Sequence, residues 1–227
     1  MSFEDVRDRF EELAFEYDEV VLRVVPKYIE QNDAILALIP FERSRGLKAL
    51  DLGSGTGVLS YLILKAFPKA EVVAFDLSDK MLEVCAANLS AYSGRFTLRE
   101  GNYATDDIGE GYDVVVAGLT VHHLEHAQKQ RLFERVLEAL SPGGVFLMRD
   151  LVLGASPSLT DIYRAMWREY MSSEGEDPEV WFARHLEYDI PASVEDQTAW
   201  LREAGFADVG CHWRYLNFAI FGGRKPE

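Results

Sequence analysis

A glycine-rich loop is the segment of this sequence best suited to bind a ligand. It consists of Gly53, Ser54, Gly55, Thr56 and Gly57. The loop follows a nearly continuous apolar run that ends at Leu52. Glycine lets a ligand lie against the backbone, and free N–H groups at the start of a following helix favour a polar or negatively charged group.

An acid stands at a matching place one strand later. The next apolar run ends at Asp76, nineteen residues after Gly57. An acid at this place in a nucleotide-binding sheet accepts hydrogen bonds from both hydroxyls of a ribose. Loop and acid together predict an adenosine-containing ligand. The alternative is a tight turn followed by an aspartate that caps a helix.

Two adjacent histidines, His122 and His123, follow the fourth apolar run. Histidine titrates near neutrality, so either is a candidate general base. The alternative is that they cap the next helix or bond to backbone. A metal site is a further possibility, because His126 lies four residues after His122. However, a helix that begins at about Glu125 would not align the two rings. Since no cysteine or close acid pair completes four ligands, we expect no metal.

Residues 158–191 are the expected substrate lid. Arg184 fits the fork of a carboxylate and stands among aromatic residues, so the candidate substrate-binding residues are Arg184, Trp167 and Tyr188. A surface ion pair with Glu187 is the alternative for Arg184. One helical face carries Leu159, Ile162, Tyr163, Met166, Trp167 and Tyr170. We expect this stripe to pack in the core rather than to line a pocket.

Alternating strands and helices must position these residues. The apolar runs expected as strands are 47–52, 71–76, 96–99, 113–118 and 144–151. Helical spacing is found at 57–67, 79–92 and 126–140. Strands that are buried on both faces read as continuous apolar runs, and the alternation predicts a parallel sheet with right-handed crossovers.

The two ends of the chain differ from this repeat. A helix from Ser193 to Gly205 precedes two runs, 209–215 and 216–221, that should pair as an antiparallel hairpin. Apolar positions predict helices over 3–16 and between Pro26 and Pro40. We therefore expect an N-terminal helical cap at 1–39 and one α/β domain at 40–227.

Composition excludes several classes of partner. The 227 residues carry a formal net charge of −15, which argues against nucleic acid and against an anionic membrane surface. No run approaches the length of a membrane span, and the N-terminus lacks the features of a signal peptide. Cys85 and Cys211 are the two cysteines, too few for a disulfide framework. We expect a cytoplasmic protein.

The strand, loop and acid resemble those of class I S-adenosylmethionine (SAM)-dependent methyltransferases. The resemblance covers residues 47–152 and the final hairpin. It implies a Rossmann-like α/β fold, with a mostly parallel seven-stranded sheet and helices on both faces. A dehydrogenase fingerprint, G-x-G-x-x-G, is the rival. Here the third glycine comes one residue early, at Gly57, and residues 140–144 favour the methyltransferase.

The resemblance also assigns residues to the cofactor. The loop would hold the methionine part of SAM, and Asp76 would hold the ribose. Leu77 and Met81 would flank the adenine, and Asn102 stands where the family often has an acid that holds the adenine amino group. The remaining residues assigned to the cofactor are Asp51, Tyr103, Leu119 and Tyr28.

Four stretches are similar to the carboxy-SAM synthase branch of the superfamily: 25–28, 119–124, 193–206 and 215–218. In that branch a tyrosine from the cap reaches the cofactor, and an arginine from the lid holds an extra carboxylate. Tyr28 and Arg184 match these residues by position. The branch has other residue types at Asn102, His122 and His123.

Methyl transfer from SAM to a small-molecule acceptor is the function that these observations favour. One alternative is a carboxy-SAM synthase-like conversion of SAM itself. A second is a non-catalytic SAM-binding module. The acceptor, the use of a general base and the oligomeric state, including a homodimer, stay open.

Overall fold

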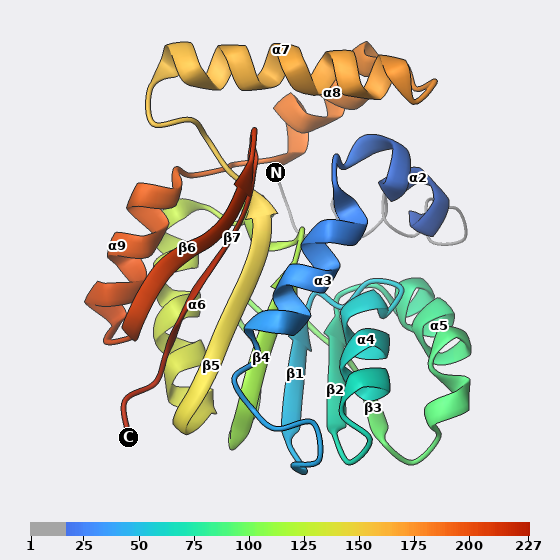
Figure 1. Ribbon diagram of the computed structural model, residues 1–227, viewed down its shortest axis with the longest axis vertical. Helices are drawn as coiled ribbons and strands as arrows, with labels where there is room; N and C mark the ends of the chain where they lie inside the picture. The colour runs from blue at the N-terminus through green and yellow to red at the C-terminus, as the bar shows by residue number, and fades with distance from the viewer. Residues whose placement is uncertain (1–16) are drawn as a thin grey trace.

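One seven-stranded sheet forms the centre of the protein. The computed structural model describes residues 17–227. The strand order is β3-β2-β1-β4-β5-β7-β6 (Figure 1). The strands are β1 (Lys48–Leu52), β2 (Glu71–Asp76), β3 (Phe96–Glu100), β4 (Tyr112–Gly118), β5 (Leu140–Leu151), β6 (Ala207–Tyr215) and β7 (Phe218–Arg224). Strand β7 pairs antiparallel with β5 and β6, whereas the other pairs are parallel. The predicted fold class is confirmed.

Helices cover both faces of the sheet. Helices α3 (Tyr28–Leu38), α4 (Val58–Ala66) and α5 (Asp79–Asn88) share one apolar cluster with the sheet. Helices α6 (His126–Ala139) and α9 (Val194–Ala204) share another on the opposite face. Most residues of the central strands β1 and β4 are buried between them, which explains why these strands have continuous apolar sequences.

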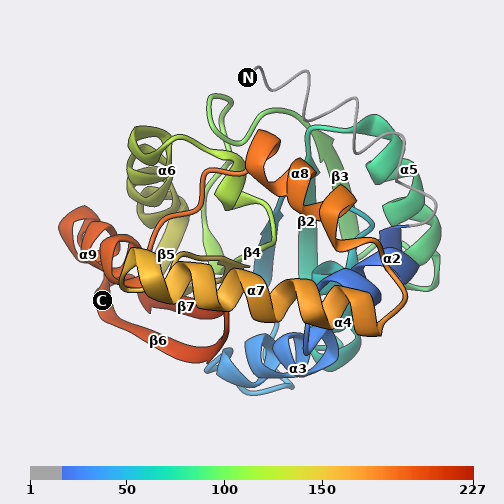
Figure 2. The same cartoon turned by 90° about the horizontal axis from the view of Figure 1, so that it is seen from above.

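Three helices lie above the carboxyl ends of the strands: α2 (Tyr17–Val24), α7 (Pro157–Ser173) and α8 (Pro178–Tyr188). Figure 2, seen from above, shows α7 and α8 crossing this end of the sheet. Val21, Trp167 and Phe182 belong to one buried cluster that joins the three helices. Asp18 of α2 also accepts a hydrogen bond of 2.6 Å from the hydroxyl of Thr56 in the glycine loop. The three helices therefore enclose the ligand side of the sheet.

Several boundaries differ from the sequence predictions. Helix α2 was not predicted, and the helix predicted over 3–16 lies outside the described residues. The helix predicted over 79–92 ends at Asn88 and is followed by a short 3₁₀ turn, Ser90–Tyr92. Strand β5 begins at Leu140 instead of 144. Within residues 17–227, no helix is long and apolar enough to cross a bilayer.

The aromatic stripe of α7 is only partly a core element. Trp167 is 5% exposed, but Ile162 is 53% and Met166 is 44% exposed. The prediction that the whole stripe packs in the core is therefore wrong. Helix α7 lies at the outside of the molecule, so that only one edge of the stripe meets α2 and α8.

Candidate active site

A cavity at the carboxyl ends of β1, β2 and β4 gathers the residues predicted to bind the cofactor. All of them line it except Gly57 and Asn102. An added Cβ at Gly57 would lie 2.6 Å from Sγ of Cys85, so this glycine lets α4 pack against α5. The side chain of Asn102 accepts a hydrogen bond of 2.9 Å from the backbone N–H of Ala104. Tyr103, the next residue, lines the cavity instead.

The glycine loop needs glycine for its backbone angles. Gly53 and Gly55 have φ values of 63° and 54°, in the left-handed region that other residues rarely adopt. Asp76 holds the loop, since one carboxylate oxygen accepts the N–H of Gly55 at 2.8 Å and the other accepts that of Ser78 at 2.9 Å. A carboxylate offers about four lone-pair sites, so Asp76 keeps acceptor capacity for a ligand. Burial raises the pKa of Asp76.

Asp51 lies beneath the loop and is 1% exposed. It accepts two hydrogen bonds from Ser60, from the backbone N–H at 3.0 Å and from the hydroxyl at 2.7 Å. Burial raises the pKa of Asp51 to about 6, although these hydrogen bonds oppose the shift. Asp51 thus ties the start of α4 to the end of β1 and places a carboxylate in the cavity.

Arg149 also lines this cavity, and the sequence analysis missed it. It is 3% exposed and donates a hydrogen bond of 3.0 Å to the hydroxyl of Tyr28. The guanidinium stacks on the Tyr28 ring, 4.3 Å from its centroid. A signal was present in the sequence, because Arg149 and Asp150 are two charged residues inside the otherwise apolar strand β5.

A second cavity adjoins the first, beneath α2, α7 and α8. Its volume is about 130 Å³, many times the ~10–15 Å³ that one water needs. Its walls are mainly apolar, and the candidate substrate-binding residues Trp167, Arg184 and Tyr188 line it. Arg184 lies over the ring of Trp181, 4.8 Å from the centroid. The predicted substrate residues are thus brought together next to the first cavity, which we call the cofactor cavity because it gathers the residues predicted to bind the cofactor.

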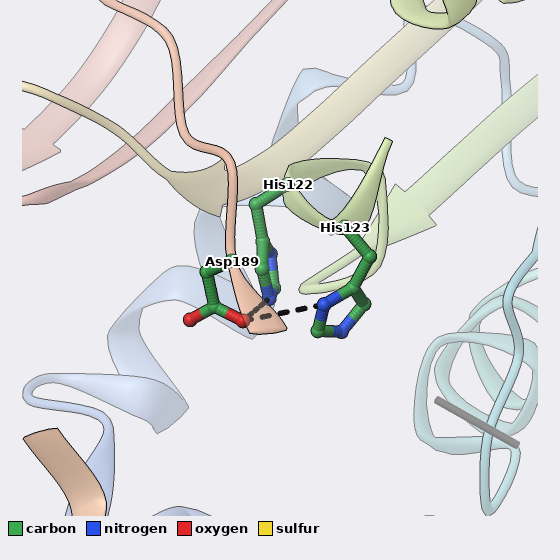
Figure 3. Close-up of side chains that lie close together, drawn as sticks. All are labelled: His122, His123 and Asp189. Carbon is green, nitrogen blue, oxygen red and sulfur yellow. Dashed lines mark ion pairs between the residues drawn. The ribbon is translucent and has the colours of Figure 1, made fainter. Parts of the chain in front are cut away.

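Both predicted catalytic histidines line the second cavity, and they surround a carboxylate (Figure 3). Nδ1 of His122 lies 2.5 Å from Asp150, and its Nε2 lies 3.6 Å from Asp189. Nδ1 of His123 lies 3.2 Å from the same oxygen of Asp189. The other oxygen of Asp189 lies 2.9 Å from Nδ1 of His185. Sequence reasoning missed both acids, because the distance along the chain separates them from the histidines.

The surroundings of the two histidines shift their pKa values in opposite directions. Burial would lower the pKa of His122, and Lys129 acts in the same direction, but the carboxylates of Asp150 and Asp189 outweigh both and raise it. Burial and the neighbouring charge of His122 lower the pKa of His123. Burial would raise the pKa of Asp189, yet the histidines around it lower it. His122 is therefore the stronger base of the pair.

The same cluster has the composition of a metal site. Ligand atoms of His122, His123 and Asp189 lie within 4.8 Å of one another. The pair considered from the sequence was a different one: His126 lies 5.4 Å from the Trp200 ring, away from this cluster. Zinc sites use three or four such ligands, while His122 and Asp189 also contact each other directly. The expectation of no metal stays a prediction.

Comparison with known sequences points in the same direction as the geometry. The methyltransferase domain family matches residues 50–146. A carboxy-S-adenosyl-L-methionine synthase from Nautilia profundicola is 24% identical over 214 residues, covering 93% of this chain and 91% of that protein. A ubiquinone/menaquinone biosynthesis C-methyltransferase from Syntrophotalea carbinolica is 27% identical over 173 residues, covering 76% and 72%.

Solved structures share the fold. Human N-acetylserotonin methyltransferase in complex with SAM has a TM-score of 0.66 at 18% identity, covering 97% of this chain and 57% of that one. An O-methyltransferase family protein from Burkholderia thailandensis has a TM-score of 0.68 at 17% identity, covering 97% and 60%. This chain spans about six tenths of the length of these two proteins. The predicted resemblance is confirmed: residues 50–146 match the methyltransferase domain family, and the chain has the fold of the class I SAM-dependent methyltransferases, with a further similarity to the carboxy-SAM synthases.

Proposed function

We propose that this protein transfers the methyl group of SAM to an oxygen or nitrogen atom of a small molecule, with His122 as the general base. One observation carries the proposal: His122, whose Nδ1 lies 2.5 Å from Asp150, lines a cavity that adjoins the cofactor cavity. Tyr17, Leu119 and His123 line both cavities, so they mark the place where the two meet.

The residues of the first cavity fit the cofactor. The glycine loop offers backbone N–H groups, and Asp76 offers an acceptor for the ribose hydroxyls. The apolar side chains of Leu77 and Met81 form a wall for the adenine ring. Ser54 also contributes a hydroxyl to the wall of this cavity. When bound, SAM would supply a methyl group that an acceptor attacks in line, with S-adenosylhomocysteine as the leaving group.

His122 would remove the proton of the acceptor as that displacement occurs. Asp150 holds Nδ1, which leaves Nε2 facing the cavity and the carboxylate of Asp189. The two acids stabilise the imidazolium that forms. A base is useful only for an acceptor whose nucleophilic atom carries a proton with a high pKa, such as a hydroxyl.

The walls of the second cavity indicate the class of acceptor. Val21, Val24 and Phe218 provide apolar surface, and Arg184 provides a cation stacked on Trp181. Such a site favours a partly aromatic molecule with an acidic group. The net charge of −15 disfavours a nucleic acid as the acceptor.

The proposal is tested by supplying SAM and a panel of hydroxylated aromatic acids and measuring S-adenosylhomocysteine. His122→Asn should lower kcat by about 10²–10⁴-fold, as expected for loss of a general base. Binding of S-adenosylhomocysteine, measured by calorimetry, should change less than twofold. His126→Asn is the matched control, because His126 lies against Trp200 outside both cavities. Equal turnover by His122→Asn and the control would remove His122 as the base.

A second candidate is a carboxy-SAM synthase-like conversion of SAM. The similarity to the synthase from Nautilia profundicola over 93% of this chain favours it, as does the place of Arg184 beside the cofactor cavity. Mass spectrometry of small molecules released from freshly purified protein distinguishes the two. SAM or S-adenosylhomocysteine supports methyl transfer, while a mass greater by one carboxyl group supports the synthase. Turnover with any acceptor excludes a non-catalytic binding module.

A further inference from the structure

Arg149 is a buried cation whose hydrogen-bonding capacity is largely unused. Its guanidinium carries five N–H donors, and one nitrogen, Nη2, bonds to the hydroxyl of Tyr28. Within residues 17–227, neither Nε nor Nη1 has a hydrogen-bond partner. Burying a charge is costly unless it is paired and hydrogen-bonded. An arginine that is 3% exposed and lines a ligand cavity is therefore well placed to receive an anion.

Tyr28 and Gly118 fix the position of this guanidinium. The ring of Tyr28 stacks on it while the hydroxyl accepts its hydrogen bond. Gly118 pairs with Arg149 in the register of β4 and β5. An added Cβ at Gly118 would lie 3.0 Å from Nε of Arg149. Glycine at this place leaves room for the guanidinium at the edge of the cavity.

The position along the sheet indicates which part of the cofactor Arg149 would meet. The proposed ribose acceptor, Asp76, ends β2, and the glycine loop follows β1. Arg149 lies on β5, with β1 and β4 between it and β2. A SAM molecule whose ribose is held by Asp76 would place its amino-acid part across the loop, on the side of β4 and Arg149.

We propose that Arg149 binds the carboxylate of the amino-acid part of SAM, through charge-assisted hydrogen bonds from the N–H groups that Tyr28 leaves unused. The inference rests on the proposed function. Arginine suits this task because its planar fork matches a carboxylate. Tyr28 then acts on the cofactor through Arg149, as a positioning residue.

A carboxylate could also come from an extra carboxyl group on the transferred methyl of SAM. The two cavities separate these sources. Arg149 lines the cofactor cavity and not the acceptor cavity, whereas Arg184 lines the acceptor cavity and not the cofactor cavity. We therefore assign the amino-acid carboxylate to Arg149.

Calorimetry with two ligands tests the assignment without turnover. The ligands are S-adenosylhomocysteine and its decarboxylated analogue, which differ only in the carboxylate. Wild type should bind S-adenosylhomocysteine at least tenfold more tightly than the analogue. Arg149→Met should weaken S-adenosylhomocysteine at least tenfold and change the analogue less than twofold. Arg131→Met, the matched control at an exposed arginine outside both cavities, should change both less than twofold.

Different failures have different meanings. Equal losses for both ligands in Arg149→Met would show a structural role and overturn the inference, as would no loss for either. In a further titration with carboxy-SAM, weakened binding of that ligand with unchanged binding of S-adenosylhomocysteine would assign Arg149 to the transferred group and overturn the inference. Wild type that binds neither ligand would refute the proposed cofactor and the inference with it. Should Arg149→Met not fold, Arg149→Lys and Arg149→Gln are compared, and Lys should retain more of the preference.

Discussion

At the scale of single residues, the acids of the candidate site act by contacting the histidines and changing their pKa values. His122 is held from two sides, by Asp150 at Nδ1 and by Asp189 near Nε2. Asp189 in turn lies within 3.2 Å of both His123 and His185. The carboxylates of Asp150 and Asp189 raise the pKa of His122, whereas burial and the charge of His122 lower the pKa of His123.

The first prediction concerns the acid limb of the pH profile. A base works in its neutral form, so turnover should fall as the pH drops through the pKa of His122, which lies above its ordinary value of 6.5. Asp150→Asn removes a carboxylate that raises this pKa while burial, which lowers it, remains. The limb of kcat/KM should therefore move to lower pH, and the plateau should fall by about tenfold or more as the ring loses its orientation.

The control for this prediction is His122→Asn, whose residual activity should lack the limb altogether. A limb that stays at the same pH in Asp150→Asn would show that another group titrates. A limb that moves to higher pH would contradict the electrostatic assignment of Asp150.

At the scale of elements, the sequence predicted what depends on local pattern. Strands β1, β2 and β4 were recognised because continuous apolar runs are typical of strands covered on both faces. The helix after Ser193 was recognised because Ser193 caps its first turn and Gly205, with φ at 106°, ends it. Helix α2 was missed because it has only eight residues, two of them buried.

In the candidate site, too, the features that depend on local sequence could be predicted and the others could not. The glycine loop and Asp76 could be predicted because a turn and the strand end beside it are fixed by nearby sequence. Asp189 and Arg149 could not be assigned, because their roles arise from contacts between distant parts of the chain: Asp189 with His122, and Arg149 with Tyr28. Asn102 was expected in the cofactor site from its order in the chain, but a local turn directs its side chain to Ala104.

The second prediction separates backbone strain from steric conflict in the glycine loop. Gly53 and Gly55 both have positive φ, so alanine at either costs about 1–2 kcal/mol of stability. An added Cβ at Gly53 would lie 2.2 Å from Oγ1 of Thr120, but at Gly55 it would meet nothing within 4 Å. Since Tyr103 holds Thr120 by a hydrogen bond, Gly53→Ala should cost about 2–5 kcal/mol in all.

Urea unfolding of the two alanine variants gives the comparison. Gly55→Ala is the matched control, because it introduces the same residue at nearly the same φ. Equal losses of unfolding free energy would mean that Thr120 moves aside, and that the glycine at 53 is required by its backbone angle alone.

At the scale of the whole molecule, the ligand side of the sheet concentrates charge that the fold must bury. The chain is acidic throughout, with a net charge of −15, yet two arginines, Arg149 and Arg184, line its two cavities. Asp51 is placed in the same region, 1% exposed. Charged groups in a ligand cavity are expected to lower the stability of the protein in exchange for ligand binding. The free energy of unfolding should therefore reveal their contribution.

The last prediction follows from the pKa of Asp51, about 6 in the folded protein against an ordinary 3.8. A raised pKa means that the folded state holds the proton more tightly than the unfolded state. The contribution of Asp51 to stability is therefore full below pH 3.8 and is lost as the pH rises through 6, a change of up to about 3 kcal/mol. Asp51→Asn has no such proton, so its stability relative to wild type should rise by about that amount between pH 4 and pH 7. Urea unfolding across this range measures the difference, with exposed Asp208→Asn as the baseline for removing one carboxylate. A constant difference between wild type and Asp51→Asn would show that Arg149 already neutralises Asp51, and that the cofactor cavity holds an ion pair before any ligand binds.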